Sequence, residues 1–240
     1  MNMPLSEAQI ARLIDHTLLK PETTRDDIRK LCEEALQYGF ASVCVNPWTV
    51  ALAAELLRGS SVKVCTVVGF PLGATLSEVK VFEARKCMEL GAQEIDMVIN
   101  IGALKSGQLD VVEKDIRGVV EVAHQGGGIC KVIIETAILS REEKIQASFA
   151  AKDARADFVK TSTGFSSGGA TPEDVRLIRE TIGPGPGIKA AGGVRTLEDL
   201  SKMVEAGATR IGASAGAKII EQARSGKLPS SQAGPDSGKY

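Results

Sequence analysis

The sequence has few of the residues that mark several common classes of protein. Aromatic residues make up only 4% of its 240 positions, and the formal net charge is -1. A nucleic-acid-binding face needs basic and aromatic side chains, so the composition argues against such a partner. No apolar run approaches the roughly 20 residues that a membrane-spanning helix needs. Residues 1–9 also lack a basic segment followed by an apolar one, so no secretory signal is expected.

Metal ligands and redox motifs are scarce as well. The five cysteines are scattered without a Cys-x-x-Cys pair, and the two histidines, His16 and His124, form no cluster in the sequence. This pattern provides neither a zinc site nor a disulfide framework. We therefore expect no metal, no cofactor, and the reduced thiols of a cytoplasmic protein.

What the sequence does contain is a regular series of short apolar runs. They have the length of strands, are rich in Val and Ile, and do not alternate with exposed polar residues, as is typical of parallel strands buried on both faces. The eight runs are 13–19, 41–45, 62–68, 94–99, 130–134, 157–161, 187–190 and 209–212.

Helix start and stop signals separate these runs. Capping-box patterns begin at Thr24, Thr75, Ser140 and Thr196, and glycines such as Gly39 and Gly183 follow the helical segments. Eight strands alternating with helices predict a single-domain (β/α)8 TIM barrel over residues 1–223. The alternative is a doubly wound open sheet, but its Gly-x-Gly-x-x-Gly turn is absent. Residues 224–240 have no periodicity and are predicted to form a flexible tail.

Two lysines occupy equivalent places near the ends of consecutive strands. Lys160 and Lys189 each close a short apolar run and precede a glycine turn. Barrel enzymes place their active sites at the carboxyl ends of the strands, and neighbouring strands lie ~4.8 Å apart. We expect burial and mutual repulsion to lower the pKa of both lysines, leaving one neutral and able to form a Schiff base. The alternative is that each lysine closes its strand and reaches solvent or a helix C-terminus. Either lysine fits the role of nucleophile on these grounds.

Other polar residues fall within or at the ends of the apolar strands. Asp96 interrupts an apolar strand, where a carboxylate needs a partner, so we expect it to pair with the lysines and to carry protons through water. A purely structural ion pair is the alternative. Lys131 and Glu135 are four residues apart and are predicted to share a face of one strand, in a charge network or a plain ion pair. Cys44, near the end of its strand, is a candidate for the pocket wall.

A phosphate site is predicted at the glycine turns after the last strands. Backbone N–H groups in such turns bind anions, and the loops after strands seven and eight are the usual phosphate site of this barrel. The predicted residues are Gly192, Gly193, Arg195, Gly212 and Ser214, with Thr163 and Gly164 covering the same place.

Several of these segments together resemble the deoxyribose-phosphate aldolase family. They are KVIIET at 131–136, FVKTSTG at 158–164, KAAGGVRT at 189–196 and IGAS at 211–214, and DHTLL, VCVNP and GFPLG fit as well. The resemblance spans residues 15–217 in the same order.

This resemblance implies a metal-free class I aldolase. Such an enzyme reversibly cleaves 2-deoxy-D-ribose 5-phosphate to D-glyceraldehyde 3-phosphate and acetaldehyde, a step in deoxyribose phosphate catabolism. It implies that Lys160 forms the Schiff base, that Lys189 lowers the pKa of Lys160, and that Asp96 manages protons. Asp15 and Thr17 are placed near the substrate, and Lys131 is counted with them.

The chain departs from the family pattern at two positions. Phe165 stands where some relatives have a lysine, and Ala215 stands where some have a second serine. Both departures bear on the affinity for phosphate more than on the chemistry. Some family members end in a tyrosine that reaches the site as a proton carrier, which makes Tyr240 a candidate. The composition of residues 224–240 indicates only a mobile tail.

Two other functions remain open at this stage. One is another enzyme on the same barrel, either transaldolase-like or an isomerase of phosphosugars, the latter needing a carboxylate base and no imine. The other is a non-catalytic regulator that binds a phosphosugar. Both leave the paired lysines unexplained. The expected partners are a small phosphosugar and a second copy of the chain, since dimers are the commonest homo-oligomers.

Overall fold

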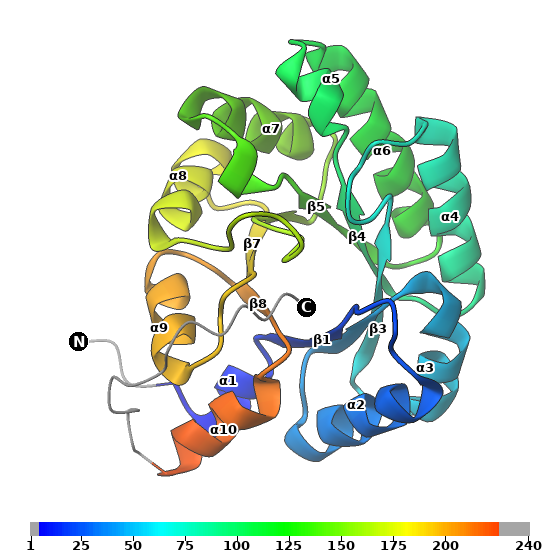
Figure 1. The fold of residues 1–240 in the computed structure, drawn as a ribbon, viewed down its shortest axis with the longest axis vertical. Helices are drawn as coiled ribbons and strands as arrows, with labels where there is room; N and C mark the ends of the chain where they lie inside the picture. Colours follow the sequence, from blue (N-terminus) through cyan, green and yellow to red (C-terminus); the bar gives the residue numbers. More distant parts are fainter. Residues whose placement is uncertain (1–4, 226–240) are drawn as a thin grey trace.

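The computed structural model describes residues 5–225 and has a closed barrel of eight parallel strands (Figure 1). The strands are β1 (Ile14–Leu18), β2 (Ser42–Val45), β3 (Lys63–Val68), β4 (Glu94–Val98), β5 (Ile129–Ile133), β6 (Phe158–Lys160), β7 (Gly187–Ala191) and β8 (Arg210–Ala213). They pair in chain order, and β8 returns to β1. The predicted (β/α)8 barrel is confirmed, each predicted strand overlaps an observed one, and the open-sheet alternative is excluded.

Helices connect the strands and cover the outside of the barrel (Figure 1). They are α1 (Glu7–Ala11), α2 (Arg25–Tyr38), α3 (Val50–Leu56), α4 (Ser77–Glu89), α5 (Ile101–Lys105), α6 (Leu109–Gln125), α7 (Arg141–Asp153), α8 (Pro172–Ile182), α9 (Leu197–Glu205) and α10 (Gly216–Ser225), with 3-10 turns η1 (Pro47–Thr49) and η2 (Thr136–Ile138). Arg224 and Ser225 belong to α10, and the rest of the predicted tail lies outside the described residues. The division into a domain and a tail therefore stays a prediction. Within residues 5–225, no helix is long and apolar enough to cross a membrane.

Capping explains where most helices begin. At Thr24, Ser140 and Thr196 the side-chain oxygen accepts the backbone N–H three residues on, and the acidic side chain at that position accepts the N–H of the capping residue. The box predicted at Thr75 is wrong, because α4 begins at Ser77 after an uncapped Leu76. A tertiary contact accompanies this start: Ser77 Oγ donates to Asp115 Oδ1 of α6 at 2.8 Å.

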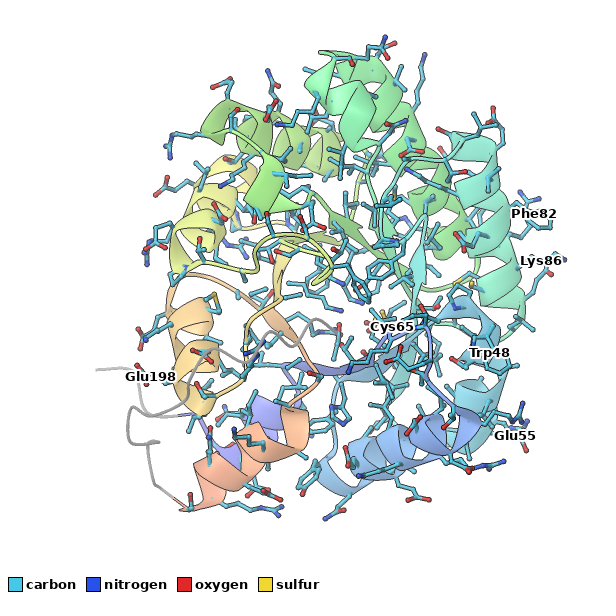
Figure 2. All side chains as sticks on the ribbon, in the orientation of Figure 1. Trp48, Glu55, Cys65, Phe82, Lys86 and Glu198 are labelled. Atoms are coloured by element: carbon cyan, nitrogen blue, oxygen red, sulfur yellow. The ribbon has the colours of Figure 1, made fainter. Side chains whose placement is uncertain are left out.

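The two faces of the barrel wall differ in chemistry. Residues that point outward, such as Val43, Ile95 and Val132, are fully buried in the apolar core beneath the helices. Alternate residues point inward, and there the wall carries lysines and carboxylates that meet across the barrel, as in the contact between Lys189 of β7 and Asp15 of β1. Figure 2 shows Cys65 inside the ring of strands, whereas Trp48 and Phe82 lie on the outside.

Phe158, the first residue of β6, lies at the amino-terminal end of the barrel and is half-buried. The guanidinium of Arg210 lies over this ring, 5.3 Å from its centroid. Gly187, the register partner of Phe158 on β7, leaves the space that the ring needs, since a Cβ there would lie 2.3 Å from it.

Candidate active site

Three lysines from three neighbouring strands converge on Asp96. Lys160 Nζ of β6 and Lys189 Nζ of β7 lie 2.8 and 2.7 Å from Asp96 Oδ2, and Lys131 Nζ of β5 lies 2.8 Å from Oδ1. The register explains this meeting, because Asp96 is aligned with Lys131, and Lys160 with Lys189. The structure thus brings Lys160, Lys189 and Asp96 together as the sequence predicted.

A second layer of charge lies below these groups. Lys189 Nζ also contacts Asp15 Oδ2 at 2.6 Å, and Lys131 Nζ contacts Glu94 Oε2 at 2.7 Å. Arg210 Nη1 bridges Asp15 Oδ1 at 2.6 Å and Glu94 Oε2 at 3.0 Å. Asp15 and Lys131, predicted to bind substrate, are therefore fully buried and already bonded within the network. Thr17 Oγ1 is likewise engaged, since it donates to the Asp15 carbonyl at 2.8 Å.

The network holds more basic groups than acidic ones. Among the described residues, four basic side chains share three carboxylates: the basic ones are Lys131, Lys160, Lys189 and Arg210, and the carboxylates are Asp15, Glu94 and Asp96. Lys131 contacts all three carboxylates and Lys189 contacts two, whereas Lys160 contacts only Asp96. Of the three lysines, Lys160 has the fewest carboxylates within ion-pair distance, and Glu135 acts on it from farther away.

The electrostatics of the buried groups follow from these contacts. Burial disfavours charge at Lys189, but Asp15 and Asp96 outweigh it and raise the pKa of Lys189 above the ordinary value. Burial also opposes ionisation of Asp96, yet Lys131, Lys160 and Lys189 hold the pKa of Asp96 well below its usual range. The expectation that both lysines have lowered pKa values is therefore wrong for Lys189, because the shared carboxylates outweigh repulsion between the amines.

Glu135 has a different partner from the one predicted. β5 ends at Ile133, and Glu135 adopts a left-handed backbone with φ 59°, so it does not share a strand face with Lys131. Its carboxylate instead accepts the backbone N–H of Thr163, 3.3 Å from each oxygen, and the Thr163 hydroxyl. Burial raises the pKa of Glu135. This carboxylate ties the end of β5 to the turn that follows Lys160.

The glycine turns of the predicted phosphate site lie side by side. Gly192 and Gly193 have φ values of 84° and 81°, in the region that favours glycine. The Gly192 carbonyl accepts the Ala170 N–H at 3.0 Å, and a Cβ on Gly192 would lie 3.7 Å from the Gly164 Cα. The loops after β6 and β7 are therefore in contact.

The other predicted phosphate residues are dispersed around this turn. Ser214 is exposed just past β8, one residue before Ala215 and two before the start of α10. Arg195 is exposed, and its backbone N–H bonds to Asp199 at 3.1 Å. Gly212 has a steric role, since a Cβ there would lie 3.0 Å from Lys189 Cε. Tyr240 lies outside the described residues.

The mouth of the barrel is partly apolar. Phe165 packs edge-on against Phe70 with ring centroids 5.3 Å apart, and both rings rest on a small apolar cluster of the inner wall that includes Leu19 and Val67. A cavity of about 320 Å³ opens beside Phe165, Thr163 and Glu135. Phe165, which stands where some relatives have a lysine, therefore packs against apolar side chains in this chain.

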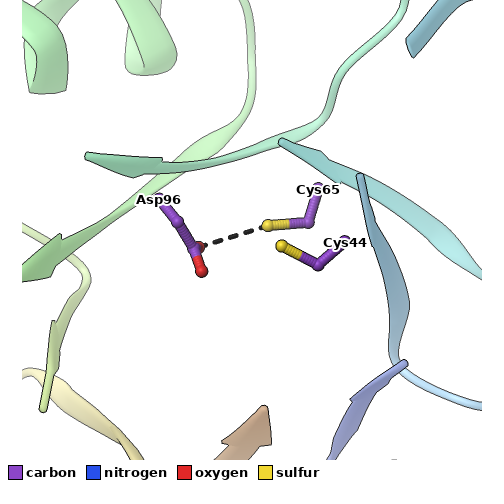
Figure 3. Close-up of side chains that lie close together, drawn as sticks. All are labelled: Cys44, Cys65 and Asp96. Atoms are coloured by element: carbon purple, nitrogen blue, oxygen red, sulfur yellow. Dashed lines mark hydrogen bonds between the residues drawn. The ribbon is translucent and has the colours of Figure 1, made fainter. Parts of the chain in front are cut away.

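Two cysteines line the inner wall next to Asp96 (Figure 3). Cys44 of β2 and Cys65 of β3 are register partners, and the Cys65 thiol donates to Asp96 Oδ1 at 3.2 Å. Cys44, predicted as a candidate for the pocket wall, lies on the inner wall of the barrel, and no role in the site was predicted for Cys65. Glu94 and Arg210 were missed as well. The sequence did contain a signal for Glu94: it precedes Asp96 by two residues on the same strand, and residues two apart point to the same face.

Two groups among residues 5–225 have the spacing of metal ligands. They are Cys44, Cys65 and Asp96, and Asp15, Cys65 and Glu94, with ligand atoms within 4.8 Å of one another. In both groups the carboxylates are already bonded to lysine or arginine, so a cation would meet positive charge. The arrangement favours ion pairs, and the predicted lack of a metal stays a prediction.

The chain is similar to proteins of known family over nearly its whole length. Residues 10–225 match the family described as DeoC/LacD family aldolase. Proteins named deoxyribose-phosphate aldolase from Geobacillus sp. and Thermococcus gammatolerans are 61% and 63% identical to it, each comparison covering 90% of this chain and 96% of the relative.

Solved structures agree with the sequence comparisons. A putative deoxyribose-phosphate aldolase from Coccidioides immitis superposes with a TM-score of 0.88 at 43% identity, covering 93% of this chain and 88% of that one. The deoxyribose phosphate aldolase from Aeropyrum pernix, described as a unique tetramer, gives 0.86 at 36% identity, covering 92% and 93%. The family match and the identity of these relatives show that the chain belongs to the DeoC/LacD family of aldolases, enzymes of the lyase class.

Proposed function

We propose that this chain reversibly cleaves 2-deoxy-D-ribose 5-phosphate to D-glyceraldehyde 3-phosphate and acetaldehyde through a Schiff base on Lys160. The reaction belongs to the breakdown of deoxyribose phosphate. The names of the relatives support the substrate, and the charge network around Asp96 supports the mechanism.

One observation carries the choice of Lys160 as the nucleophile. Four basic side chains share three carboxylates, so the network reaches charge balance when one of them is neutral. Removing a proton from Lys131 would weaken its pairing with three carboxylates, and removing one from Lys189 would weaken its pairing with two, although each carboxylate keeps another basic partner. Removing it from Lys160 affects one carboxylate that two other ammonium groups still neutralise. The neutral amine is the form that attacks a carbonyl.

The reaction follows from this neutral amine. Lys160 Nζ attacks the aldehyde carbon of the open-chain sugar, and water leaves as the iminium forms. The iminium withdraws electrons, so the bond between the second and third carbons breaks, giving an enamine and the new aldehyde as the third-carbon hydroxyl loses its proton. Protonation of the enamine and hydrolysis of the resulting iminium then release acetaldehyde.

Proton movement is assigned to Asp96 and Lys189. The low pKa of Asp96 makes it a transient acceptor, so we propose that it passes protons between water and the lysines without storing them. Lys189 remains protonated beside Asp96, where it can donate a proton and where its charge favours the neutral form of Lys160. The proposed role of Asp15, Lys131 and Thr17 is to hold Lys189 and Asp96 in position.

The phosphate is assigned to the loops after β6, β7 and β8. Gly192 and Gly193 form a turn in contact with the loop that contains Gly164, and Ser214 stands exposed before α10. Backbone N–H groups in such turns bind anions. An anchor there would orient the sugar toward Lys160, while its binding energy supports the geometry of the reacting carbons.

Borohydride trapping tests the assignment. The protein is incubated with deoxyribose 5-phosphate and borohydride, and the modified peptide is mapped by mass spectrometry, with Lys160→Arg as a matched control. An adduct on Lys160 supports the proposal, whereas an adduct on Lys189 reverses the two roles. If a folded protein binds phosphate and gives no adduct, the isomerase or the regulator becomes the better function.

A homo-oligomer in the cytoplasm is also proposed. The tetramer described for the Aeropyrum pernix relative supports self-association, and the five unpaired cysteines fit a reducing compartment. Light scattering after size-exclusion chromatography measures the number of subunits. A monomer at all concentrations would contradict the first part.

A further inference from the structure

Two thiols face each other on the inner wall of the barrel. Cys44 and Cys65 are register partners on β2 and β3, and both are fully buried. Their sulfur atoms and an oxygen of Asp96 all lie within 4.8 Å of one another. In Figure 3 both sulfurs point from their strands toward the same carboxylate.

This placement suits a bond between the two sulfurs. Neighbouring strands lie ~4.8 Å apart, within the 4.4–6.8 Å that disulfides usually span between Cα atoms. Both side chains are on the same face of the sheet, so rotation about their side-chain bonds brings the sulfurs together. The other cysteines, Cys32, Cys87 and Cys130, are also buried, but none of them is a register partner of another cysteine.

The charges around Cys44 differ from those around the other cysteines. The contact with Cys65, with the charges of Lys189 and Lys160, lowers the pKa of Cys44 in spite of burial. Burial raises the pKa of Cys32 to about 11 and that of Cys87 to about 12, and it raises that of Cys130 as well. The thiolate is the reactive form of cysteine, so Cys44 is the thiol that this environment activates.

The pair is joined to the groups assigned to catalysis. The Cys65 thiol donates to Asp96 Oδ1 at 3.2 Å, and Lys131 Nζ donates to the Cys65 sulfur at 3.2 Å. A disulfide sulfur has no proton to donate. Oxidation would therefore remove one hydrogen bond from Asp96 and draw the sulfur toward Cys44.

We propose that Cys44 and Cys65 form a reversible disulfide when the protein meets a peroxide, and that this oxidised form is less active. The Cys44 thiolate attacks one peroxide oxygen, giving a sulfenic acid while the other oxygen leaves and is protonated to water. The Cys65 sulfur then attacks the sulfenic sulfur, and its proton leaves with the hydroxide as a second water. Two electrons pass from the thiols to the peroxide, and an added dithiol reverses the change.

The same atoms are less suited to binding a metal ion. A cation between Cys44, Cys65 and Asp96 would lie near the ammonium groups of Lys131 and Lys189, each within 2.8 Å of that carboxylate. The positive surroundings that favour a thiolate also repel a second cation. Oxidation is therefore the chemistry that the charges favour.

Peptide mapping tests the bond itself. The full chain is treated with hydrogen peroxide, denatured with an alkylating agent and digested without reduction. We expect a Cys44–Cys65 cross-linked peptide and an intact mass about 2 Da below that of the reduced protein. The cross-link must be absent from Cys44→Ser and Cys65→Ser and present in the control Cys87→Ser. Sulfinic acid at either residue without a cross-link would overturn the proposal. Failure of peroxide to form the bond, together with protection of both thiols from alkylation by added zinc, would also overturn it.

Activity tests the consequence. We expect peroxide to lower the turnover of the unmodified chain about tenfold or more, the effect of losing one hydrogen bond to a carboxylate, and a dithiol to restore it. In Cys44→Ser, activity after treatment should equal that variant's own activity before treatment, whereas in Cys65→Ser the Cys44 thiol can still form a sulfenic acid but no cross-link. A full cross-link with unchanged turnover would overturn the regulatory part. This part rests on the proposed aldolase function, but the cross-link does not, so the two failures are distinguishable.

Discussion

Two buried lysine–carboxylate sites lie on opposite sides of the barrel wall. Outside it, Lys80 of α4 pairs with Asp115 of α6 at 2.5 Å, and both side chains are fully buried. Lys80 Nζ also donates to the Val98 carbonyl at 2.8 Å, and Ser77 donates to the other oxygen of Asp115. Here one ammonium has one carboxylate and every charge is satisfied. Inside the wall, four basic groups share three carboxylates.

The difference separates structure from chemistry. Burial lowers the pKa of Lys80 although Asp115 opposes the shift, while the shared carboxylates raise that of Lys189. A lowered pKa therefore does not by itself identify a reactive lysine. The surplus of basic groups and the single contact of Lys160 are more informative, because neutralising Lys160 weakens one ion pair, whereas neutralising Lys131 or Lys189 weakens three or two.

The largest effect is expected from replacing Lys160, the lysine inside the barrel. We expect Lys160→Arg to lower turnover by at least about 10⁴-fold and to leave the fold intact, because arginine keeps the charge and cannot form an imine. Steady-state kinetics and circular dichroism measure the two properties. Turnover within tenfold of the original in a folded variant would remove Lys160 from the mechanism.

The matching change outside the barrel should act on stability. We expect Lys80→Met to lower the free energy of unfolding by about 3–5 kcal/mol, since it leaves Asp115 buried without a counter-charge. The native fraction should keep most of its turnover. The control is Lys80→Met with Asp115→Leu, which removes both charges and should recover much of the loss. Urea unfolding measures each value, and a double variant no more stable than the single one would contradict the paired description.

A smaller effect is expected at Lys189. Lys189→Leu removes an ammonium that lies 2.7 Å from Asp96 Oδ2, the oxygen that also binds Lys160. In the proposed mechanism, this neighbouring positive charge disfavours a second ammonium beside Asp96. We expect the acid limb of the pH–rate profile to move up by about one pH unit. A limb at the original pH, in a variant that still folds, would show that Lys189 does not tune this amine.

The smallest effect concerns the acid stability of the network. The pKa of Asp96 is lower in the folded protein than the ordinary value of 3.8, so the unfolded chain binds more protons as pH falls below that value. The stability that Asp96 contributes is present above pH 3.8 and is lost as pH falls through the folded pKa. We expect Asp96→Asn to reduce the slope of unfolding free energy against pH in this window. An unchanged slope would assign the acid sensitivity to other groups.

The sequence was sufficient for the architecture and for the central residues of the site. Apolar runs interrupted by Asp96 and ended by Lys160 and Lys189 predicted both the barrel and the meeting of these groups. Glu94 and Arg210 were missed because their contact joins β4 to β8 across the barrel. The sequence pattern does not show at which level along the barrel axis each residue lies. Glu135 was misplaced because β5 ends two residues before it, where the backbone becomes left-handed.

The ring of Phe158 beneath Arg210 has a consequence for the order of events. Phe158 and Arg210 occupy the amino-terminal end, so in the proposed mechanism sugar, water and both products use the opposite end, where barrel enzymes place their active sites. In that mechanism the two-carbon fragment stays covalently attached to Lys160 after the carbon–carbon bond breaks, while the three-carbon phosphate is free. The proposal therefore requires the phosphorylated product to depart first and acetaldehyde second, and acetaldehyde to enter before its partner in the synthetic direction.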